Sequence, residues 1–320
     1  MSDEGEAAGP IVFTDYLPAD YVSLLGDDAN AAGQLMHILG GIVHKYAPGT
    51  PLVLTGDFAR SIQDNSDARG IPAQYDLARG ANLVSAKTMR NPEGSMTIYL
   101  PAWFVFGFDD EDDEQRAWRY QYAAFTAAHE AAHALHRERE EDSEATFNAL
   151  QITSAEDQHY AQAAGLIVEE YRAQLAAESV LVNPSNFIEN LEADLDSLTE
   201  SMGQAKRLAG SDVPTAARIH GDALTNFAKG LALAAAEARA RGDESSALPL
   251  EHSSWARFAP VWSGLRVALD RLPAGYSQAD MAMLAALTHE LMELVRVLEA
   301  QSGIERIWHG ENPLMYWRAA

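Results

Sequence analysis

Cysteine is absent from the 320 residues of this chain. Its absence excludes disulfides, thiolate nucleophiles, and the zinc and iron–sulfur sites that are built on cysteine. A metal ion bound by this protein would therefore need histidine and carboxylate ligands. The sequence offers 10 histidines and 47 acidic residues for that purpose.

Basic residues are scarce as well. The chain has 23 Lys and Arg against 47 Asp and Glu, which gives a formal net charge of −24. Nucleic acids and anionic membrane surfaces are both bound through clusters of Lys and Arg. The composition therefore argues against a nucleic-acid partner and against a membrane partner.

Long apolar runs and a secretory leader are also missing. No stretch reaches the roughly 18 apolar residues of a membrane span, and the first residues have neither the basic nor the apolar part of a signal peptide. We therefore expect a soluble, cytoplasmic protein. Because 47% of the residues are hydrophobic, the chain can bury a large core, and at about 150 residues per domain its length suggests two domains.

Turn and helix signals divide the chain into three parts. Residues 1–9 are predicted to be a disordered tail, residues 10–182 mix short strands with helices, and residues 183–320 have helical patterns throughout. The predicted strands are residues 52–54, 81–84 and 95–100, and the predicted helices are residues 28–46, 113–141, 154–182, 183–210, 212–242, 253–272 and 277–303. The predicted fold is α+β and predominantly helical, with a small sheet followed by a C-terminal helical bundle.

The chemistry-bearing motif lies within the predicted helix 113–141 and reads His129-Glu130-Ala131-Ala132-His133. Histidines four residues apart project from one face of a helix, so both imidazoles can bind the same ion. Glu130 lies about 100° further round the helix than His129, within reach of a water on that ion. This H-E-x-x-H arrangement is typical of zinc metallopeptidases, in which the Glu is the general base.

A catalytic zinc site needs a third protein ligand besides the two histidines. The predicted helix 154–182 supplies two adjacent candidates, Glu169 and Glu170. We favour Glu170, because it shares a helix face with small residues and with Gln174, whose amide could support a ligating histidine. Glu169 is the alternate third ligand. The non-catalytic interpretations are a solvated face for Glu169, and a partner of Arg172 or Arg137 for Glu170.

The motif and its flanks resemble those of the ImmA/IrrE-type zinc metallopeptidases, which belong to the zincins. The resemblance covers about residues 95–182. That family has a Phe-Thr-x-Ala lead-in, His-Glu-x-Gly-His and a later Glu-x-x-Ala-Asn motif, and the matching segments here are Phe125-Thr126-Ala127-Ala128, the motif with Ala132 in place of the Gly, and Glu170-Tyr171-Arg172-Ala173-Gln174. The resemblance implies that His129, His133 and Glu170 bind Zn²⁺ and that Glu130 is catalytic.

The same resemblance implies a function and a place for the substrate. It implies hydrolysis of peptide bonds in a protein or peptide substrate, with a regulatory protein as one such substrate. In zincins a strand just upstream of the metal helix commonly forms the sheet edge that pairs with an extended substrate; here that strand would be residues 95–100. The residues of the chain do not identify the substrate or the oligomeric state.

Two segments between this strand and the motif are interpreted as structural and not as catalytic. Trp103-Phe104-Val105-Phe106 is predicted to lie in the core, with the wall of a substrate cleft as the alternative. Residues 109–114 are all acidic, which is typical of a solvated helix start.

Two other function classes fit parts of the sequence. A di-iron carboxylate oxidase uses two Glu-x-x-His motifs in a helical bundle, and Glu130…His133 and Glu156…His159 have this spacing. The other class is a non-catalytic interaction protein that is stabilised by its metal. Metal analysis and the effect of chelation distinguish these classes from a peptidase.

Overall fold

The computed structural model describes residues 10–26, 30–71, 78–79, 82–83, 86–106, 112–183, 186–243, 248, 250–273 and 275–317. The tail predicted over residues 1–9 lies outside this part of the chain. Two compact units are present: residues 1–77, 84–138 and 180–185 make the first, and residues 78–83, 139–179 and 186–320 make the second. This division does not coincide with the predicted domain boundary at residues 182–183.

The first unit is built on a mixed four-stranded sheet with the order β1-β2-β6-β5. Strands β1, β2 and β6 are parallel, and β5 runs antiparallel to β6. The bounds of these strands are β1 Val12–Asp15, β2 Leu52–Thr55, β5 Lys87–Arg90 and β6 Met96–Pro101. The prediction that residues 95–100 form the edge strand of the sheet is therefore wrong. The corresponding strand β6 is paired on both sides, and β5 is the outer strand beyond it.

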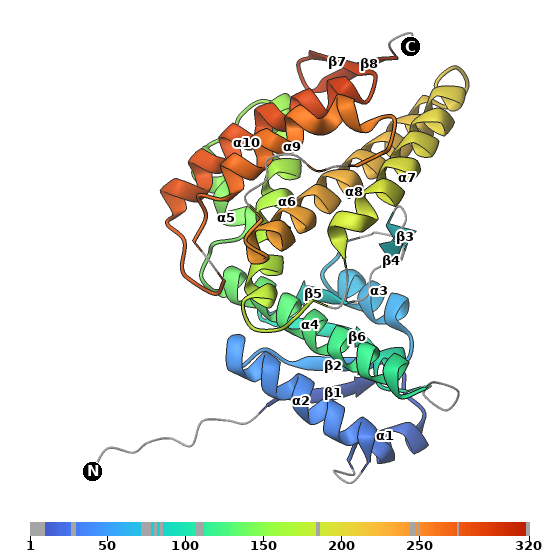
Figure 1. Cartoon of the computed structure of the whole chain (residues 1–320), viewed down its shortest axis with the longest axis vertical. Coiled ribbons are helices and arrows are strands. Elements are labelled where there is room, and N and C mark those ends of the chain that lie inside the picture. Colours follow the sequence, from blue (N-terminus) through green and yellow to red (C-terminus); the bar gives the residue numbers. More distant parts are fainter. Residues whose placement is uncertain are drawn as a thin grey trace. The chain divides into compact units, whose positions relative to one another are not determined.

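Helices connect and cover these strands. They are α1 Ala19–Leu25, α2 Ala31–Tyr46, α3 Phe58–Ala68, the short 3-10 helix η1 Ala102–Phe104, and α4 Asp113–Glu138. Parallel strands need crossover connections, and α2 and α3 lie in the connections that follow β1 and β2 (Figure 1). The core of this unit joins apolar side chains of α2, β2 and β6 to the alanine face of α4, namely Ala123, Ala127, Ala131 and Ala134.

The second unit is a helical assembly with two small hairpins. Its helices are α5 Ser143–Leu150, α6 Ala155–Glu178, α7 Phe187–Leu208, α8 Val213–Ala240, α9 Trp255–Leu269 and α10 Met281–Gln301. Its strands are β3 Ala78–Arg79, β4 Asn82–Leu83, β7 Ile304–His309 and β8 Asn312–Trp317. Helix α8 packs against α6, α7 and α9, and α10 packs against α5, α6 and α9 (Figure 1).

The predicted class, α+β and predominantly helical, is confirmed. The expectation that the chain is helical throughout from residue 183 is wrong at its end, where β7 and β8 form an antiparallel hairpin. None of the helices in the described part of the chain is both long and apolar enough to cross a bilayer.

A buried histidine lies where the β7–β8 hairpin meets the helices of the second unit. His220 of α8 is fully buried, and its Nε2 lies 3.1 Å from Ser302 Oγ at the end of α10. Burial is the main reason that the pKa of His220 falls to about 4. The charged groups that act on it are Glu299, which raises this pKa, and Arg306 and His159, which lower it.

We expect this histidine to make the fold sensitive to acid. The pKa of His220 is depressed in the folded state, so between pH 6.5 and about 4 the unfolded chain binds more protons than the folded chain. Stability is therefore lost as the pH falls through that window, by up to about 3 kcal/mol for this group. Urea unfolding of wild type and His220→Gln at pH 7 and pH 4.5 measures it. Equal losses in both proteins would contradict the expectation.

Candidate metal centre

Helix α4 places the two motif histidines one turn apart. Their Nε2 atoms are 3.1 Å apart and their ring centroids 4.9 Å apart, and both side chains are half-buried. Two imidazole ligands with Zn–N bonds of about 2.0–2.1 Å and a tetrahedral angle have their nitrogens about 3.3 Å apart. The pair is therefore spaced as two ligands of one zinc ion would be.

The sequence around the motif fixes this orientation. Ala128 and Ala132 beside the histidines are fully buried, as are Ala127 and Ala131 on the core side. Small side chains on several faces let the helix lie close to its neighbours, and such packing resists rotation of the helix about its axis. The face of α4 that carries His129 and His133 is therefore held in a defined direction.

Glu130 is buried and is held by a residue that the sequence analysis did not identify. Thr88 Oγ1, on the edge strand β5, lies 2.7 Å from Glu130 Oε2 and 2.9 Å from the Glu130 carbonyl oxygen. Burial raises the pKa of Glu130, but the positive potential of His133 and His129, the Thr88 hydrogen bond and Lys87 outweigh it and lower the pKa below its usual range. The side chain is therefore ionised at neutral pH, which suits a proton acceptor.

Glu170, on α6, is buried, and one of its oxygens is paired. Its Oε1 lies 2.6 Å from Nζ of Lys229 on α8. Of the two partners suggested from the sequence, Arg172 and Arg137, Arg172 pairs with Glu141 instead. A carboxylate can accept at both oxygens, so this ion pair is compatible with a ligand role for Glu170.

Glu169 has a different task from its neighbour. Its Oε1 accepts a hydrogen bond of 2.6 Å from the backbone N–H of Ser143 at the start of α5. The two helices approach closely here, since a Cβ on Gly165 of α6 would lie 2.8 Å from Ser143 Cβ. The half-buried Glu169 thus satisfies a helix N-terminus, and the solvated face suggested for it is wrong.

The amide of Gln174, which was expected to support a ligating histidine, donates to Glu178 Oε1 at 2.9 Å.

The three predicted ligands form a group that could hold a metal ion. His129, His133 and Glu170 each offer one ligand atom, and these atoms lie within 4.8 Å of one another. Within the described residues no second group of three or more potential ligands meets this condition, and the alternate ligand Glu169 is not a member. The donor set is two imidazoles and one carboxylate, which leaves the identity of the metal open.

The second Glu-x-x-His motif is used differently. Glu156 lies in the first turn of α6, 3.5 Å from Arg296 Nε, and His159 Nε2 lies 3.9 Å from Glu299 Oε1. Neither residue is a member of the metal-binding group. These contacts tie α6 to α10, which is a structural role.

Thr88 contacts Glu130 and Lys229 contacts Glu170, and nothing in the motif or its spacing pointed to either residue. Each comes from an element far from the motif in sequence, so only the tertiary fold identifies them. The chain as a whole matches no protein-family model, no curated protein and no solved structure.

Proposed function

We propose that this protein is a zinc-dependent metallopeptidase that hydrolyses peptide bonds in a protein or peptide substrate. The observation that carries the proposal is the group of His129, His133 and Glu170 with Glu130 beside it. Two histidines and a carboxylate are the protein ligands of one class of catalytic zinc sites, which keep their fourth position for water or substrate. Imidazole ligands also make magnesium or calcium a poor match.

Each residue at the site has a separate role in the proposed hydrolysis. Zinc, when bound, acidifies a water molecule and polarises the substrate carbonyl. The Glu130 carboxylate accepts a proton from the water as the water oxygen attacks the peptide carbonyl carbon, and passes that proton to the amide nitrogen as the C–N bond breaks. Thr88 holds the Glu130 carboxylate in place through its hydrogen bond to Oε2. Lys229 orients Glu170 in the same way through their ion pair.

The sheet offers a place for the substrate backbone. Among the described strands of this sheet, β5 is paired with β6 alone, and it carries Thr88, which contacts the proposed general base. An extended peptide can add to such an edge through main-chain hydrogen bonds. This favours β5 over the predicted strand 95–100 as the strand that receives the substrate.

Metal analysis tests the proposal. We expect about one zinc per chain after loading and dialysis, and at least a 100-fold loss of zinc affinity, by order of magnitude, in His129→Ala and in Glu170→Gln. Glu169→Gln is the matched control on the same helix and should keep its zinc. Circular dichroism shows whether each variant is folded.

Other outcomes would favour the competing classes. Two irons per chain would favour the di-iron oxidase. Tight zinc binding, with a large fall in melting temperature on chelation and no hydrolysis of any peptide, would favour a structural metal. Failure of the folded wild type to bind zinc would end the peptidase proposal.

A further inference from the structure

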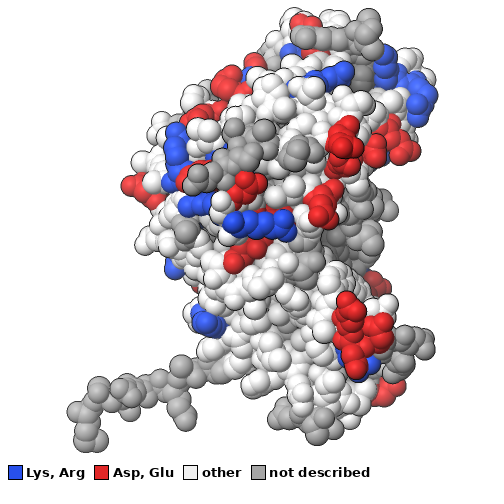
Figure 2. Space-filling model, in the orientation of Figure 1, with Lys and Arg blue, Asp and Glu red and all other residues white. Residues whose placement is uncertain are grey.

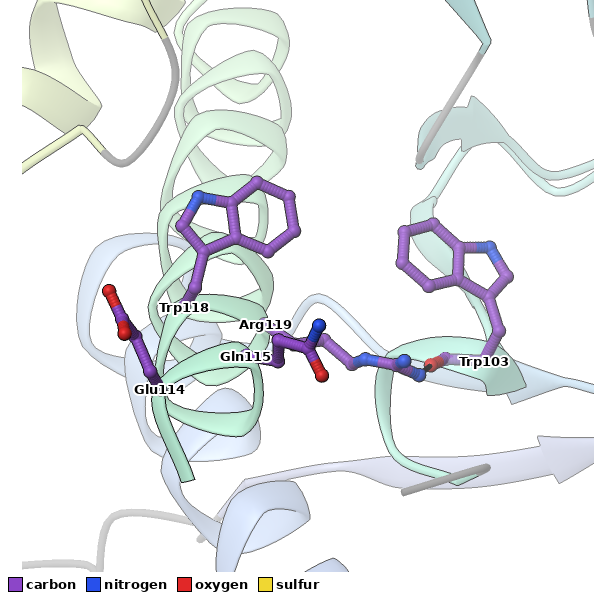
Figure 3. A pocket seen from close by; sticks show the side chains of 5 residues that line it. All are labelled: Trp103, Glu114, Gln115, Trp118 and Arg119. Atoms are coloured by element: carbon purple, nitrogen blue, oxygen red, sulfur yellow. Dashed lines mark hydrogen bonds between the residues drawn. The ribbon is translucent and has the colours of Figure 1, made fainter. Parts of the chain in front are cut away.

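A pocket at the start of α4 plays no part in the chemistry described above. It has a volume of about 550 Å³ and is lined by Trp103, Glu114, Gln115, Trp118 and Arg119. Figure 3 shows the two indole rings on opposite sides of this pocket, Trp103 from η1 after β6 and Trp118 from α4, with the Arg119 and Gln115 side chains between them.

The two tryptophans present large apolar surfaces to solvent. Trp103 is 46% exposed and Trp118 is 48% exposed, whereas Phe104 and Val105, next to Trp103, are fully buried. The core interpretation of this segment is therefore confirmed for Phe104 and Val105 and wrong for Trp103. Two half-exposed indoles across one pocket are typical of a binding site rather than of solvated surface.

The pocket walls are held in place without a ligand. Arg119 Nη1 donates hydrogen bonds to the carbonyl oxygens of Trp103, at 2.7 Å, and of Phe106, at 3.2 Å. The ring of Trp103 stacks on Phe104 at a centroid distance of 4.0 Å, and that of Trp118 stacks on Tyr122 at 5.2 Å. A ligand would therefore meet a preformed site and lose little affinity to ordering of the protein.

The charge around the pocket selects among ligands. Glu114 lines it, Asp112 and Asp113 precede Glu114, and Figure 2 shows acidic side chains gathered over the start of α4. Two cations lie nearby: Arg116 is 3.9 Å from Asp113, and the Arg119 guanidinium is held at one wall by the carbonyl oxygens of Trp103 and Phe106. The acids Asp112, Asp113 and Glu114 outnumber them at this end of α4. The faces of indole rings attract cations, and the chain carries a net charge of −24. Rings and acids together favour a cationic ligand.

We propose that the Trp103–Trp118 pocket binds a lysine or arginine side chain of a peptide, with its alkyl part between the two indoles and its cation on the Glu114 side, away from the Arg119 guanidinium. That the peptide is a substrate rests on the proposed function. Trp118 and His129 are eleven residues apart on α4, which is about three turns and about 16 Å along the axis. An extended peptide covers that distance in about five residues, so the basic residue would lie at least about five positions from the cleaved bond.

Titration of the six tryptophan indole N–H signals by NMR tests this binding without any need for turnover. The full-length Glu130→Gln protein is titrated with end-blocked Gly-Ser-Gly-Lys-Gly-Ser-Gly and with the same peptide carrying norleucine or glutamate in place of lysine. We expect saturable shifts of the Trp103 and Trp118 signals, with a Kd for the lysine peptide at least about fivefold lower than for norleucine.

Variants locate the binding. Trp118→Ala and Trp103→Ala should each weaken the lysine peptide about tenfold, Trp118→Phe should weaken it less, and Glu114→Gln should weaken it about threefold. Tyr316→Ala is the matched control, because Tyr316 is an equally exposed aromatic residue at 50%. The remaining indole signals report whether each variant is folded.

Two outcomes would overturn the inference. One is equal affinity for the lysine and norleucine peptides, which would assign the pocket to apolar side chains. The other is the absence of shifts at Trp103 and Trp118. Because binding is measured with an inactive variant, either result leaves the peptidase proposal standing, and a failed zinc analysis leaves the peptide-binding result standing.

Discussion

Replacement of Glu130 by Gln is expected to lower peptide hydrolysis by about 10³-fold and to leave zinc binding intact. A positioned general base contributes about 10²–10⁴-fold to such reactions, and Gln keeps the size and the hydrogen-bond acceptor of Glu without its basicity. Thr88 can still donate to the amide oxygen of the new side chain, as it does to Glu130 Oε2, so the local fold should persist. The assay uses a mixture of quenched fluorescent peptides, with the chelator-sensitive rate as its signal.

A second Glu→Gln change on the same helix controls for this result. Glu138, the exposed last residue of α4, accepts a hydrogen bond from Thr50 at 3.4 Å and lies about one and a half turns beyond the motif. Glu138→Gln should therefore keep the wild-type rate. If Glu130→Gln keeps its zinc and its full rate as well, Glu130 is not the base and the peptidase mechanism fails.

The motif helix and most helix starts were predictable because their signals are local. Ser154, Asp212 and Asp280 cap α6, α8 and α10 with their side chains, and each is followed by a helical pattern that the sequence displays on its own. The H-E-x-x-H spacing belongs to the same class, since one turn of helix fixes the geometry of the histidine pair.

Pairings between distant segments were not predictable in this way. The order of the sheet depends on which strands pair. The four-residue β5, with Lys87 and Arg90 at its ends, is too short and too polar to be predicted as a strand, so the sequence did not place an outer strand beyond β6. The β7–β8 hairpin was missed because the strong helical pattern that precedes it extends to Gly303. The one local signal for the hairpin was Gly310 at its turn, where the φ of 65° favours glycine. Thr88 and Lys229 reach the site through these non-local arrangements.

Arg172→Met is expected to destabilise the protein by about 3–5 kcal/mol, the largest loss of stability that we predict. Arg172 lies two residues beyond Glu170 on α6 and is buried with Glu141. Its Nη2 bonds to Glu141 Oε2, its Nη1 donates to the Glu141 carbonyl oxygen at 2.9 Å, and Ala279 N donates to the same carboxylate at 3.2 Å. Without the guanidinium, a carboxylate is left buried with its positive partner gone.

Urea unfolding followed by circular dichroism measures this loss, with an exposed ion pair as the control. Arg218 and Asp222 are paired at 3.3 Å on α8 with side chains 67% and 64% exposed. Such pairs contribute about 0.3–0.5 kcal/mol, so Arg218→Met should hardly move the midpoint. If Arg172→Met costs no more than Arg218→Met, Glu141 must gain water or a proton in the variant, and the buried pair does not hold α6.

A double-mutant cycle separates the value of the pair from the penalty of breaking it. In Glu141→Leu with Arg172→Met both charges are removed. Among the described contacts, Ala279 N loses its acceptor and the Glu141 carbonyl oxygen loses its donor, at a cost of about 1–3 kcal/mol each. Replacement of a whole buried pair by apolar groups is often neutral or stabilising. We therefore expect the double variant to be more stable than Arg172→Met, with a coupling energy of roughly 2 kcal/mol or more. Simple addition of the two single losses would show that burial, and not pairing, dominates at this point of α6.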